Sequence, residues 1–413
     1  MVLVKPATVV RTAREPLMTP AFFGGLFRLS PASNREIPCI FLTSQATICI
    51  KEGGAMKIGV LTGGGDCPGL NAAIRAIVKY GSKRYGDSFL GVKYGWKGLV
   101  NKSMPIEERV MELTPVSVSG ILTKGGTILY SSRTNPLSQA NGLEDLQYNF
   151  DELGLDGLIA IGGEDTLSVA YAAFAKFHLP VVGVPKTIDN DLCGTDTTIG
   201  FTTAYTVVTE AVDRLHSTAE SHDMIHIIEV MGRNTGWIAL RGGMAGGADI
   251  ILIPEHPLSI EAICNLIEER RRQRKHFSII VVAEGYPLEG HVVKSDQRDA
   301  FGHEQLGGVG NRLAAILKEK TGFDVRVTNP AYMQRGGIPA AYDRYIAIEL
   351  GERAVDLAHN GRFGRMAAIA RNEVIDVESP GSDGNKKGPS RAVRKNAVAF
   401  RVNFKKDQRT RWP

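Results

Sequence analysis

The sequence predicts an α/β protein with two parallel β-sheets, each covered by helices on both faces. From residue 56 onward, short apolar strand patterns alternate with helical patterns, which is typical of parallel sheets. The length of 413 residues is sufficient for two ordinary domains. The expected strands are 57–62, 157–161, 181–184, 225–230, 250–253 and 278–283, and the expected helices include 167–178, 202–219 and 260–273.

The composition indicates a soluble globular protein, with 43% hydrophobic and 23% charged residues. No apolar run reaches the roughly 20 residues that a membrane span requires. The five cysteines form no CxxC pair, which argues against a disulfide framework or a zinc site and suits a reducing cytoplasm. Residues 386–413 carry ten Lys/Arg and one Asp, so the formal charge of +5 arises at the ends and the body is mildly acidic. Nucleic-acid binding is therefore not expected.

The two ends of the chain differ from its body. Residues 1–55 show no sustained period and are expected to be an N-terminal extension without ordered structure. Their Arg, Ser and Thr content fits a transit peptide, but the preferred explanation is an upstream start codon or a disordered extension, with Met56 as the natural beginning. Residues 376–413 become rich in Gly, Ser and Pro from about Ser379 and then basic, which predicts a poorly ordered tail.

Two glycine turns are candidates for phosphate binding. "LTGGGDCPGLN" follows the first strand, and its three consecutive glycines permit close backbone approach to an anion. Asn71 can cap the next helix, whose N-terminus attracts negative charge. "KGGTILYSSRTNP" supplies a second turn with Arg133, whose guanidinium is shaped to hold phosphate oxygens. Either turn could equally be structural, and the first matches neither a Walker loop nor GxGxxG.

A third loop, "GGEDT" at 162–166, joins two glycines to two carboxylates. It follows the strand at 157–161, at the edge where open α/β sheets bind ligands. The carboxylates of Glu164 and Asp165 could lie next to a bound phosphate if Mg²⁺ lay between the carboxylates and the phosphate. They are equally explained as charges that complement the dipole of a helix N-terminus.

The stretch "GVPKTIDNDLCGTD" at 183–196 holds four groups suited to phosphoryl transfer. In an extended segment, Thr187, Asp189 and Asp191 project to one side. One carboxylate could take the proton of a substrate hydroxyl, and the other could bind or orient a metal. Lys186 could neutralise a phosphate.

The chain resembles the 6-phosphofructokinases over about residues 56–375. The motifs "GGGDCPGLNAAIR", "GGTILYSSR", "GGEDT", "PKTIDND", "EVMGR", "AEG" and "QRGG" occur in the order found in that family. The resemblance implies two Rossmann-like three-layer α/β/α domains with a cleft between them. Residues 56–200 with about 334–375 would bind the phosphoryl donor, and residues 201–333 the sugar phosphate. It further implies a cytoplasmic homodimer or homotetramer with no nucleic-acid or membrane partner.

The resemblance also implies roles for individual residues. Asp189 would be the general base for the C1 hydroxyl of fructose 6-phosphate, assisted by Thr187, Asp191 and Lys186. Glu164 would bind Mg²⁺, the expected cofactor. The donor would contact Gly65, Arg133, Asp165 and Lys186. The sugar phosphate would contact Thr187, Asp189, Met231, Gly232, Arg233, Glu284, Arg326, Tyr332 and Arg335, with Arg326 or Arg335 reaching from a neighbouring subunit.

Two positions depart from the pattern of many family members. Met224 replaces an arginine, and Tyr332 replaces a histidine. The tyrosine hydroxyl can still donate a hydrogen bond, whereas the methionine cannot. Weaker affinity for fructose 6-phosphate, or acceptance of a related sugar such as sedoheptulose 7-phosphate, would follow.

Two further positions bear on the phosphoryl donor. Asp165 and Lys186 stand where ATP-using members have glycine. A carboxylate at 165 would repel the α-phosphate of a nucleotide by roughly 4 kcal/mol at about 4 Å and a dielectric of about 20. An ammonium at 186 could bind the terminal phosphate. The pair matches diphosphate-dependent members, so a reversible transfer from inorganic diphosphate is expected. The alternatives are an ATP-dependent phosphofructokinase and a non-catalytic homologue that binds sugar phosphate.

Overall fold

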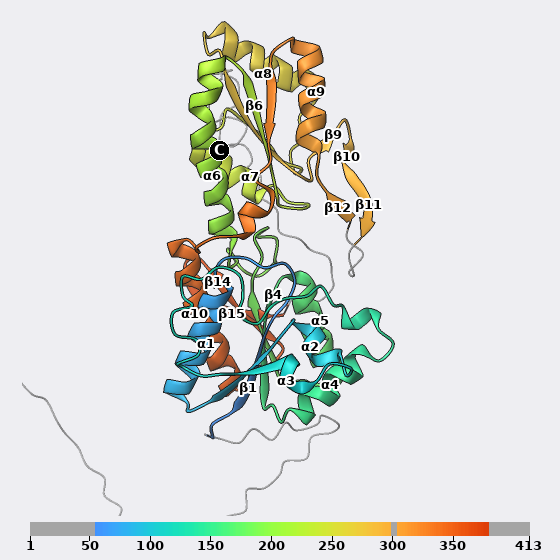
Figure 1. The fold of residues 1–413 in the computed structure, drawn as a ribbon, viewed down its shortest axis with the longest axis vertical. Helices are drawn as coiled ribbons and strands as arrows, with labels where there is room; N and C mark the ends of the chain where they lie inside the picture. Colours follow the sequence, from blue (N-terminus) through green and yellow to red (C-terminus); the bar gives the residue numbers. More distant parts are fainter. Residues whose placement is uncertain (1–53, 299–303, 380–413) are drawn as a thin grey trace, which may run out of the picture. The chain divides into compact units, whose positions relative to one another are not determined.

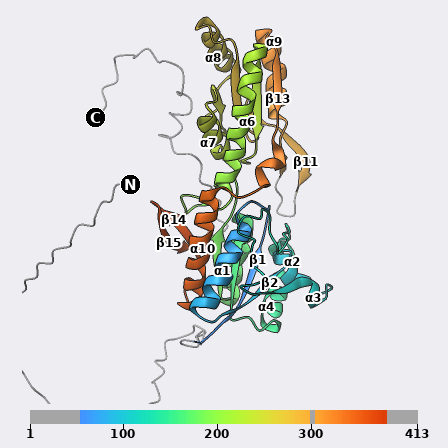
Figure 2. The ribbon, with the colours of Figure 1, turned by 60° about the vertical axis from the view of Figure 1, so that its left-hand side comes forward.

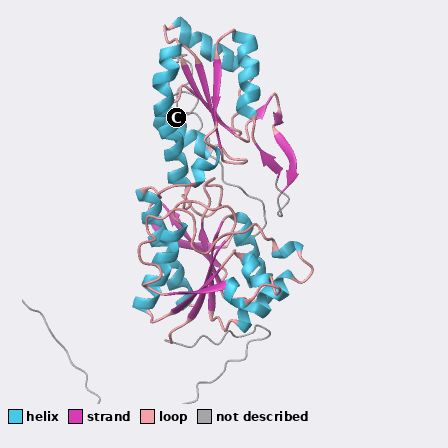
Figure 3. Cartoon of the chain, in the orientation of Figure 1, coloured by secondary structure: helices cyan, strands magenta, loops and turns pink. Residues whose placement is uncertain are grey.

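The structure is a computed structural model that describes residues 54–298 and 304–379 (Figure 1). The predicted extension at 1–55 and the predicted tail at 376–413 therefore lie almost wholly outside the described residues. Helices and strands alternate through the described part (Figure 3). None of its helices combines the length and the apolar character that a membrane span requires.

A seven-stranded sheet has the order β15-β14-β5-β4-β1-β2-β3. Its five central strands are parallel, and the two edge strands, β3 and β15, are antiparallel to their neighbours. The strands are β1 Lys57–Thr62, β2 Ser88–Val92, β3 Val110–Leu113, β4 Gly157–Gly162, β5 Val181–Pro185, β14 Arg365–Ala370 and β15 Glu373–Glu378.

Helices cover both faces of this sheet because its central strands are apolar on both sides. Ile159 and Ile161 of β4 share a core with α1 (Leu70–Arg84) and α10 (Ala341–His359), which lie side by side (Figure 2). Leu158 and Ala160 of the same strand face the opposite core. The helices of that second core are α2 Trp96–Val100, α4 Gly142–Glu152 and α5 Glu164–Phe177, and the short α3 spans Ile106–Arg109.

A four-stranded, fully parallel sheet has the order β13-β6-β8-β7. One face packs against α6 and α7, and the other against α8 and α9. The strands are β6 Ile225–Val230, β7 Ile250–Leu252, β8 Ser278–Ala283 and β13 Val325–Thr328, and the helices are α6 Phe201–His222, α7 Trp237–Gly246, α8 Ile260–Arg272 and α9 Val309–Thr321. The remaining elements are β9 Pro287–Leu288, β10 His291–Val292, β11 Lys294–Arg298, β12 Glu304–Leu306 and the 3₁₀ helices η1 Pro136–Ser138 and η2 Ala331–Arg335.

The predicted α/β class with two Rossmann-like domains is confirmed, and all six predicted strands are present. The assignment of donor and sugar to separate domains remains a prediction. One boundary differs, because β15 continues to Glu378 and so includes the first three residues of the predicted tail. The strand extends this far because its apolar residues Ile375 and Val377 pack against Leu167 and Leu192.

Candidate active site

Three loops of different sequence origin meet at the carboxyl edge of the seven-stranded sheet. The register places Thr62 of β1 beside Ile161 of β4, and Gly162 of β4 beside Pro185 of β5. The loops that follow these strands are therefore neighbours, as parallel topology requires. Lys186 N donates to Gly162 O at 3.0 Å, which joins the loop after β5 to the loop after β4.

The glycine loop after β1 needs glycine for two separate reasons. Gly64 has a φ of 79°, in the left-handed region that favours glycine. At Gly65, a Cβ atom would lie 2.5 Å from Nη1 of Arg335, so a side chain would displace the guanidinium. Arg335 also donates from Nη1 to Asp66 O at 3.2 Å. Within one chain, Arg335 therefore lies against the predicted donor loop, although the prediction placed it at the sugar 6-phosphate.

The segment bearing Arg133 borders the same loop. Gly64 N donates to Ser132 O at 3.1 Å, and the Ser131 hydroxyl donates to Gly64 O. Arg133 itself is exposed. The segment that carries Arg133 thus braces the first glycine turn at Gly64.

Lys186 is buried directly beneath the glycine loop. Its side chain is 2% exposed, and Nζ donates to Gly65 O at 2.7 Å. Burial lowers the pKa of Lys186. An anion bound by the loop would therefore stabilise the charged form of this amine.

Glu164 and Asp165 are the first two residues of α5, so they complement the dipole of this helix. Both are partly buried. A Cβ atom on the preceding Gly163 would lie 3.8 Å from Thr187 Cβ, so the GGEDT loop also borders the stretch that carries Asp189. No group of three His, Cys, Asp or Glu side chains gathers as a metal site in the described residues. A site with one carboxylate and substrate phosphates is still compatible with Mg²⁺.

Asp189 has an exceptional carboxylate. The residue is 5% exposed, and its buried Oδ1 has no hydrogen-bond partner among the described residues. Its N–H donates to Thr187 Oγ1 at 3.2 Å, and its carbonyl oxygen accepts from Thr235 Oγ1 at 3.1 Å. A buried carboxylate oxygen without a donor is costly, and it is suited to accept a proton from a bound hydroxyl.

The edge of the four-stranded sheet contributes a second carboxylate. Val230 of β6 lies beside Ala283 of β8, so Met231 and Glu284 follow neighbouring strands. Glu284 Oε1 accepts from Arg233 N at 2.8 Å. Burial, and next the negative charge of Asp189, raise the pKa of Glu284 to about 7.

The loop after β6 is held by a residue that the sequence analysis missed. Gln334 is fully buried, and its Oε1 accepts from Met231 N at 3.2 Å. Gly232 and Arg233 both have positive φ, 141° and 51°, so this loop is tightly turned. The glutamine of the "QRGG" motif was a usable signal, because it directly precedes the predicted site residue Arg335.

Three positions named from the sequence lie away from these loops within the chain. Arg326 is on β13, where its side chain is 64% exposed and pairs with Asp324. Tyr332 is 69% exposed. Met224 is buried at the amino end of β6, opposite the edge that carries Met231, and packs in the core. The sugar-phosphate contacts expected of Arg326 and Tyr332 remain predictions.

Comparisons with known proteins identify relatives of this chain. The family model described as phosphofructokinase matches residues 57–358. The pyrophosphate–fructose 6-phosphate 1-phosphotransferase of Streptomyces coelicolor is 49% identical over 324 residues, which cover 78% of this chain and 93% of the relative. The ATP-dependent 6-phosphofructokinase 3 of the same organism is 46% identical over 321 residues, which cover 77% and 92%. Among solved structures, Pichia pastoris phosphofructokinase in the T-state has a TM-score of 0.70 and 30% identity, and the match covers 81% of this chain and 38% of that longer chain.

Proposed function

Because the chain belongs to the phosphofructokinase family, we propose that it transfers a phosphoryl group from inorganic diphosphate to the C1 hydroxyl of fructose 6-phosphate. The observation that carries the choice of donor is the position of Lys186. Its buried Nζ donates to Gly65 O at 2.7 Å and occupies the space beneath the glycine loop. A glycine at this position would leave that space open to a longer donor.

Asp165 supports the same choice from the other side. It stands in the first turn of α5, and Gly163 just before this helix borders the loop that carries Thr187. A carboxylate there repels an additional phosphate group, and the repulsion of roughly 4 kcal/mol at about 4 Å corresponds to about a thousandfold in binding. Lys186 and Asp165 together favour a donor of two phosphates over a nucleoside triphosphate.

Asp189 is the proposed general base. Its free Oδ1 is the acceptor for the proton of the C1 hydroxyl, and the adjacent Thr187 holds the backbone N–H of the same residue. Gly232, Arg233 and Glu284 would line the sugar phosphate, with Arg233 as its nearest positive charge. Because a non-catalytic homologue has no need of a buried carboxylate that is unsatisfied, this geometry argues against that alternative.

Glu164 is the residue that would hold Mg²⁺, together with phosphate oxygens of the donor. When bound, the ion supplies charge neutralisation for the transferring phosphoryl group. Since phosphoryl transfer from diphosphate to the C1 hydroxyl is close to energetically balanced in this family, we expect the reaction to be reversible. We also propose a cytoplasmic homodimer or homotetramer, in which Arg326 and Tyr332 complete the sugar site of a neighbouring subunit.

A donor comparison tests the proposal. Purified protein with fructose 6-phosphate and Mg²⁺ is offered diphosphate or ATP, and the bisphosphate is measured through a coupled assay. We expect kcat/KM with diphosphate to exceed that with ATP by on the order of a hundredfold or more, as the repulsion at Asp165 implies. The similar identity to ATP-dependent relatives makes ATP the specific competitor. Higher kcat/KM with ATP would reject the diphosphate assignment and leave the phosphofructokinase reaction intact.

A further inference from the structure

We propose that the β14–β15 hairpin braces the loop that carries Asp189, and that Thr195 is the positioning residue through which this brace acts. The proposal rests on the proposed function, since it concerns the placement of the general base. It assigns a role in catalysis to residues 365–378, which lie beyond the part of the chain that the family model matches.

The need for a brace follows from the carboxylate of Asp189. Its Oδ1 makes no hydrogen bond to the described residues, so no side-chain partner holds the oxygen that would accept the proton. The position of this oxygen is therefore set by the backbone around Asp189. A displacement of about 1 Å in a reacting group can cost on the order of a hundredfold in rate.

The backbone in question is a closed loop between β5 and α6. A bridge joins Lys186 to Ile199 at its neck. The Thr198 hydroxyl donates to Thr187 O at 2.6 Å, and Asn190 Nδ2 donates to Asp196 O at 3.3 Å. These contacts close the loop, but they do not attach its far end to the rest of the molecule.

The hairpin makes that attachment through hydrogen bonds. Thr195 Oγ1 accepts from Ile369 N at 3.1 Å and donates to Thr197 O at 2.8 Å. Asp196 N donates to Ile369 O at 2.6 Å, and Arg371 N donates to Asp196 Oδ2 at 2.7 Å. The loop is thus bonded both to Ile369, near the end of β14, and to Arg371, in the turn between β14 and β15. Thr195 is 3% exposed, so water does not replace its hydroxyl contacts easily.

Apolar contacts reinforce the same attachment. Leu192 is 2% exposed and packs in a cluster with Met366, Ile375 and Val377 of the hairpin. Gly194 has a φ of 84°, and a Cβ atom there would lie 3.0 Å from Val377 Cγ2. The loop therefore lies close against β15, with no room for a larger residue at 194.

The hairpin is itself anchored firmly enough to act as a brace. The Asp376 side chain on β15 is 5% exposed and contacts three arginines. These are Arg353 of α10, Arg362 between α10 and β14, and Arg365 of β14. These contacts tie β15 to α10 and to its own partner strand. The ribbons of β14, β15 and α10 lie together in Figure 1. A rigid support behind the base is the condition for a defined catalytic geometry.

The test compares Thr195→Val with Thr195→Ser. Valine keeps the shape and removes the hydrogen bonds of the hydroxyl to Ile369 and Thr197, whereas serine keeps a hydroxyl that can make them. We expect Thr195→Val to lower kcat by about 10- to 100-fold with KM for both substrates nearly unchanged, and Thr195→Ser to retain most of the wild-type kcat. Thr321→Val is the matched control, because it removes a threonine hydrogen bond, Oγ1 to Leu317 O at 2.6 Å, within α9.

Asp196→Ala is a second variant in case Thr195→Val does not fold, because Asp196 is exposed and the change removes its side-chain bond to Arg371 N. A severalfold loss of kcat at constant KM is expected. A lower melting temperature with unchanged kcat in Thr195→Val would overturn the role of Thr195 alone. Failure of the wild type to turn over either diphosphate or ATP would overturn the proposed function and, with it, this proposal.

Discussion

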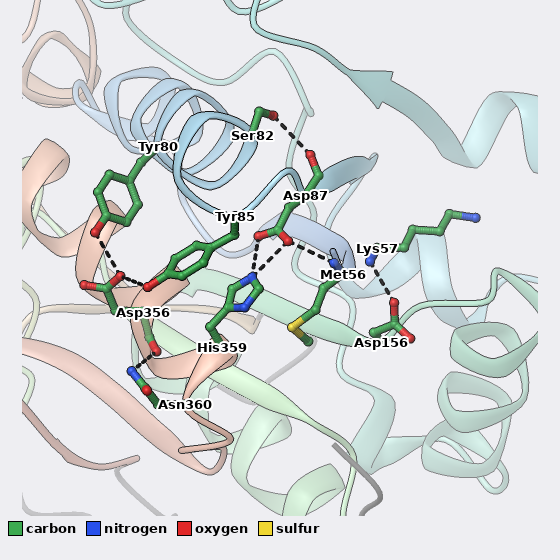
Figure 4. Close-up of polar contacts among 10 residues, drawn as sticks. All are labelled: Met56, Lys57, Tyr80, Ser82, Tyr85, Asp87, Asp156, Asp356, His359 and Asn360. Atoms are coloured by element: carbon green, nitrogen blue, oxygen red, sulfur yellow. Dashed lines mark hydrogen bonds and ion pairs between the residues drawn. The ribbon is translucent and has the colours of Figure 1, made fainter. Parts of the chain in front are cut away.

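His359 Nε2 donates to Asp87 Oδ2 at 2.8 Å and thereby links the end of α10 to the start of β2 (Figure 4). Asp87 Oδ1 also accepts from Met56 N at 2.9 Å, so one carboxylate holds the chain where it enters β1. Tyr85 stacks on the imidazole of His359, with ring centroids 3.8 Å apart. This cluster lies at the amino end of the sheet, opposite the glycine loops.

Asp87→Ala is expected to lower stability without changing the active site. The Asp87 side chain is fully buried, and its loss leaves Met56 N and His359 without their acceptor. The free energy of unfolding should fall by about 2–4 kcal/mol. Urea unfolding measures this change. Asp156→Ala, which removes an exposed acceptor for Lys57 N, is the milder control. A large change in KM for either substrate would contradict the prediction that this cluster, at the amino end of the sheet, is separate from the active site at the carboxyl end.

The neighbouring tyrosines are expected to remain protonated donors throughout the physiological range. Tyr80 and Tyr85 both donate to Asp356 Oδ1, at 3.0 and 2.9 Å. Burial, and next the hydrogen bond to Asp356, raise the pKa of Tyr80 to about 12. Ultraviolet titration of Tyr80→Phe against the wild type should therefore remove a tyrosine that ionises near pH 12. Loss of a tyrosine that ionises near pH 10 instead would contradict this assignment.

Glu284 gives a signature in the pH dependence of stability. Its pKa in the folded protein, about 7, exceeds the value of 4.5 expected for a free glutamate. Its contribution to stability is therefore fully present below about pH 4.5 and is lost as the pH rises through about 7. Relative to Glu284→Gln, the wild type should lose on the order of 2–3 kcal/mol between pH 4.5 and pH 8. Thermal unfolding of both proteins across this range measures the difference, and a constant difference would contradict the prediction.

Asp376 gives the opposite signature. Burial acts to raise its pKa, but hydrogen bonds from Arg353 and Arg365 and the charges of Arg365 and Arg362 outweigh it, so the pKa of Asp376 is lowered. Its contribution is present above about pH 4, the ordinary range of aspartate, and is lost as the pH falls further. Asp376→Asn should destabilise the protein by about 2 kcal/mol at pH 7 and by much less at pH 3. Asp324→Asn, which breaks the exposed pair with Arg326, should cost less than about 1 kcal/mol at either pH.

The donor preference can be altered at two positions. Asp165→Gly combined with Lys186→Gly should lose most diphosphate activity and gain weak activity with ATP, because the two obstacles to a longer donor are removed. Asp165→Asn separates size from charge, since it keeps the volume and abolishes the repulsion of roughly 4 kcal/mol. Steady-state kinetics with both donors measure the change. Full diphosphate activity in the double variant would contradict the role of Lys186.

The sequence predicted the strands that are continuously apolar and the loops that follow them. The strands β1, β4, β5, β6 and β8 are buried on both faces, so their runs of Ile, Val and Leu are clear. By contrast, the apolar run of β14, RMAAIA, consists mostly of alanine, and the apolar residues of β15, EVIDVE, are interrupted by an aspartate. Their strand structure depends on pairing with each other and on the packing of Leu192, which a local pattern does not contain.

The sequence predicted which loops lie together where they follow adjacent parallel strands, but not where side chains cross between distant segments. Lys186 and Gly65 could be placed together because β1, β4 and β5 share one edge. The contact of Arg335 with Gly65 joins positions far apart in the sequence, and it depends on how the 3₁₀ helix η2 is packed. The direction of a long side chain is decided by that packing rather than by its motif.

The pairing of β14 with β5 has a consequence for the synthesis of the protein. The register joins Arg365 to Val182, and the whole four-stranded sheet lies between these residues in the chain. During translation, β6, β7, β8 and β13 emerge and can pair while one side of β5 is still open. The domain whose synthesis begins first is thus the last to be completed, and the support behind Asp189 forms only when the ribosome has almost finished the described chain.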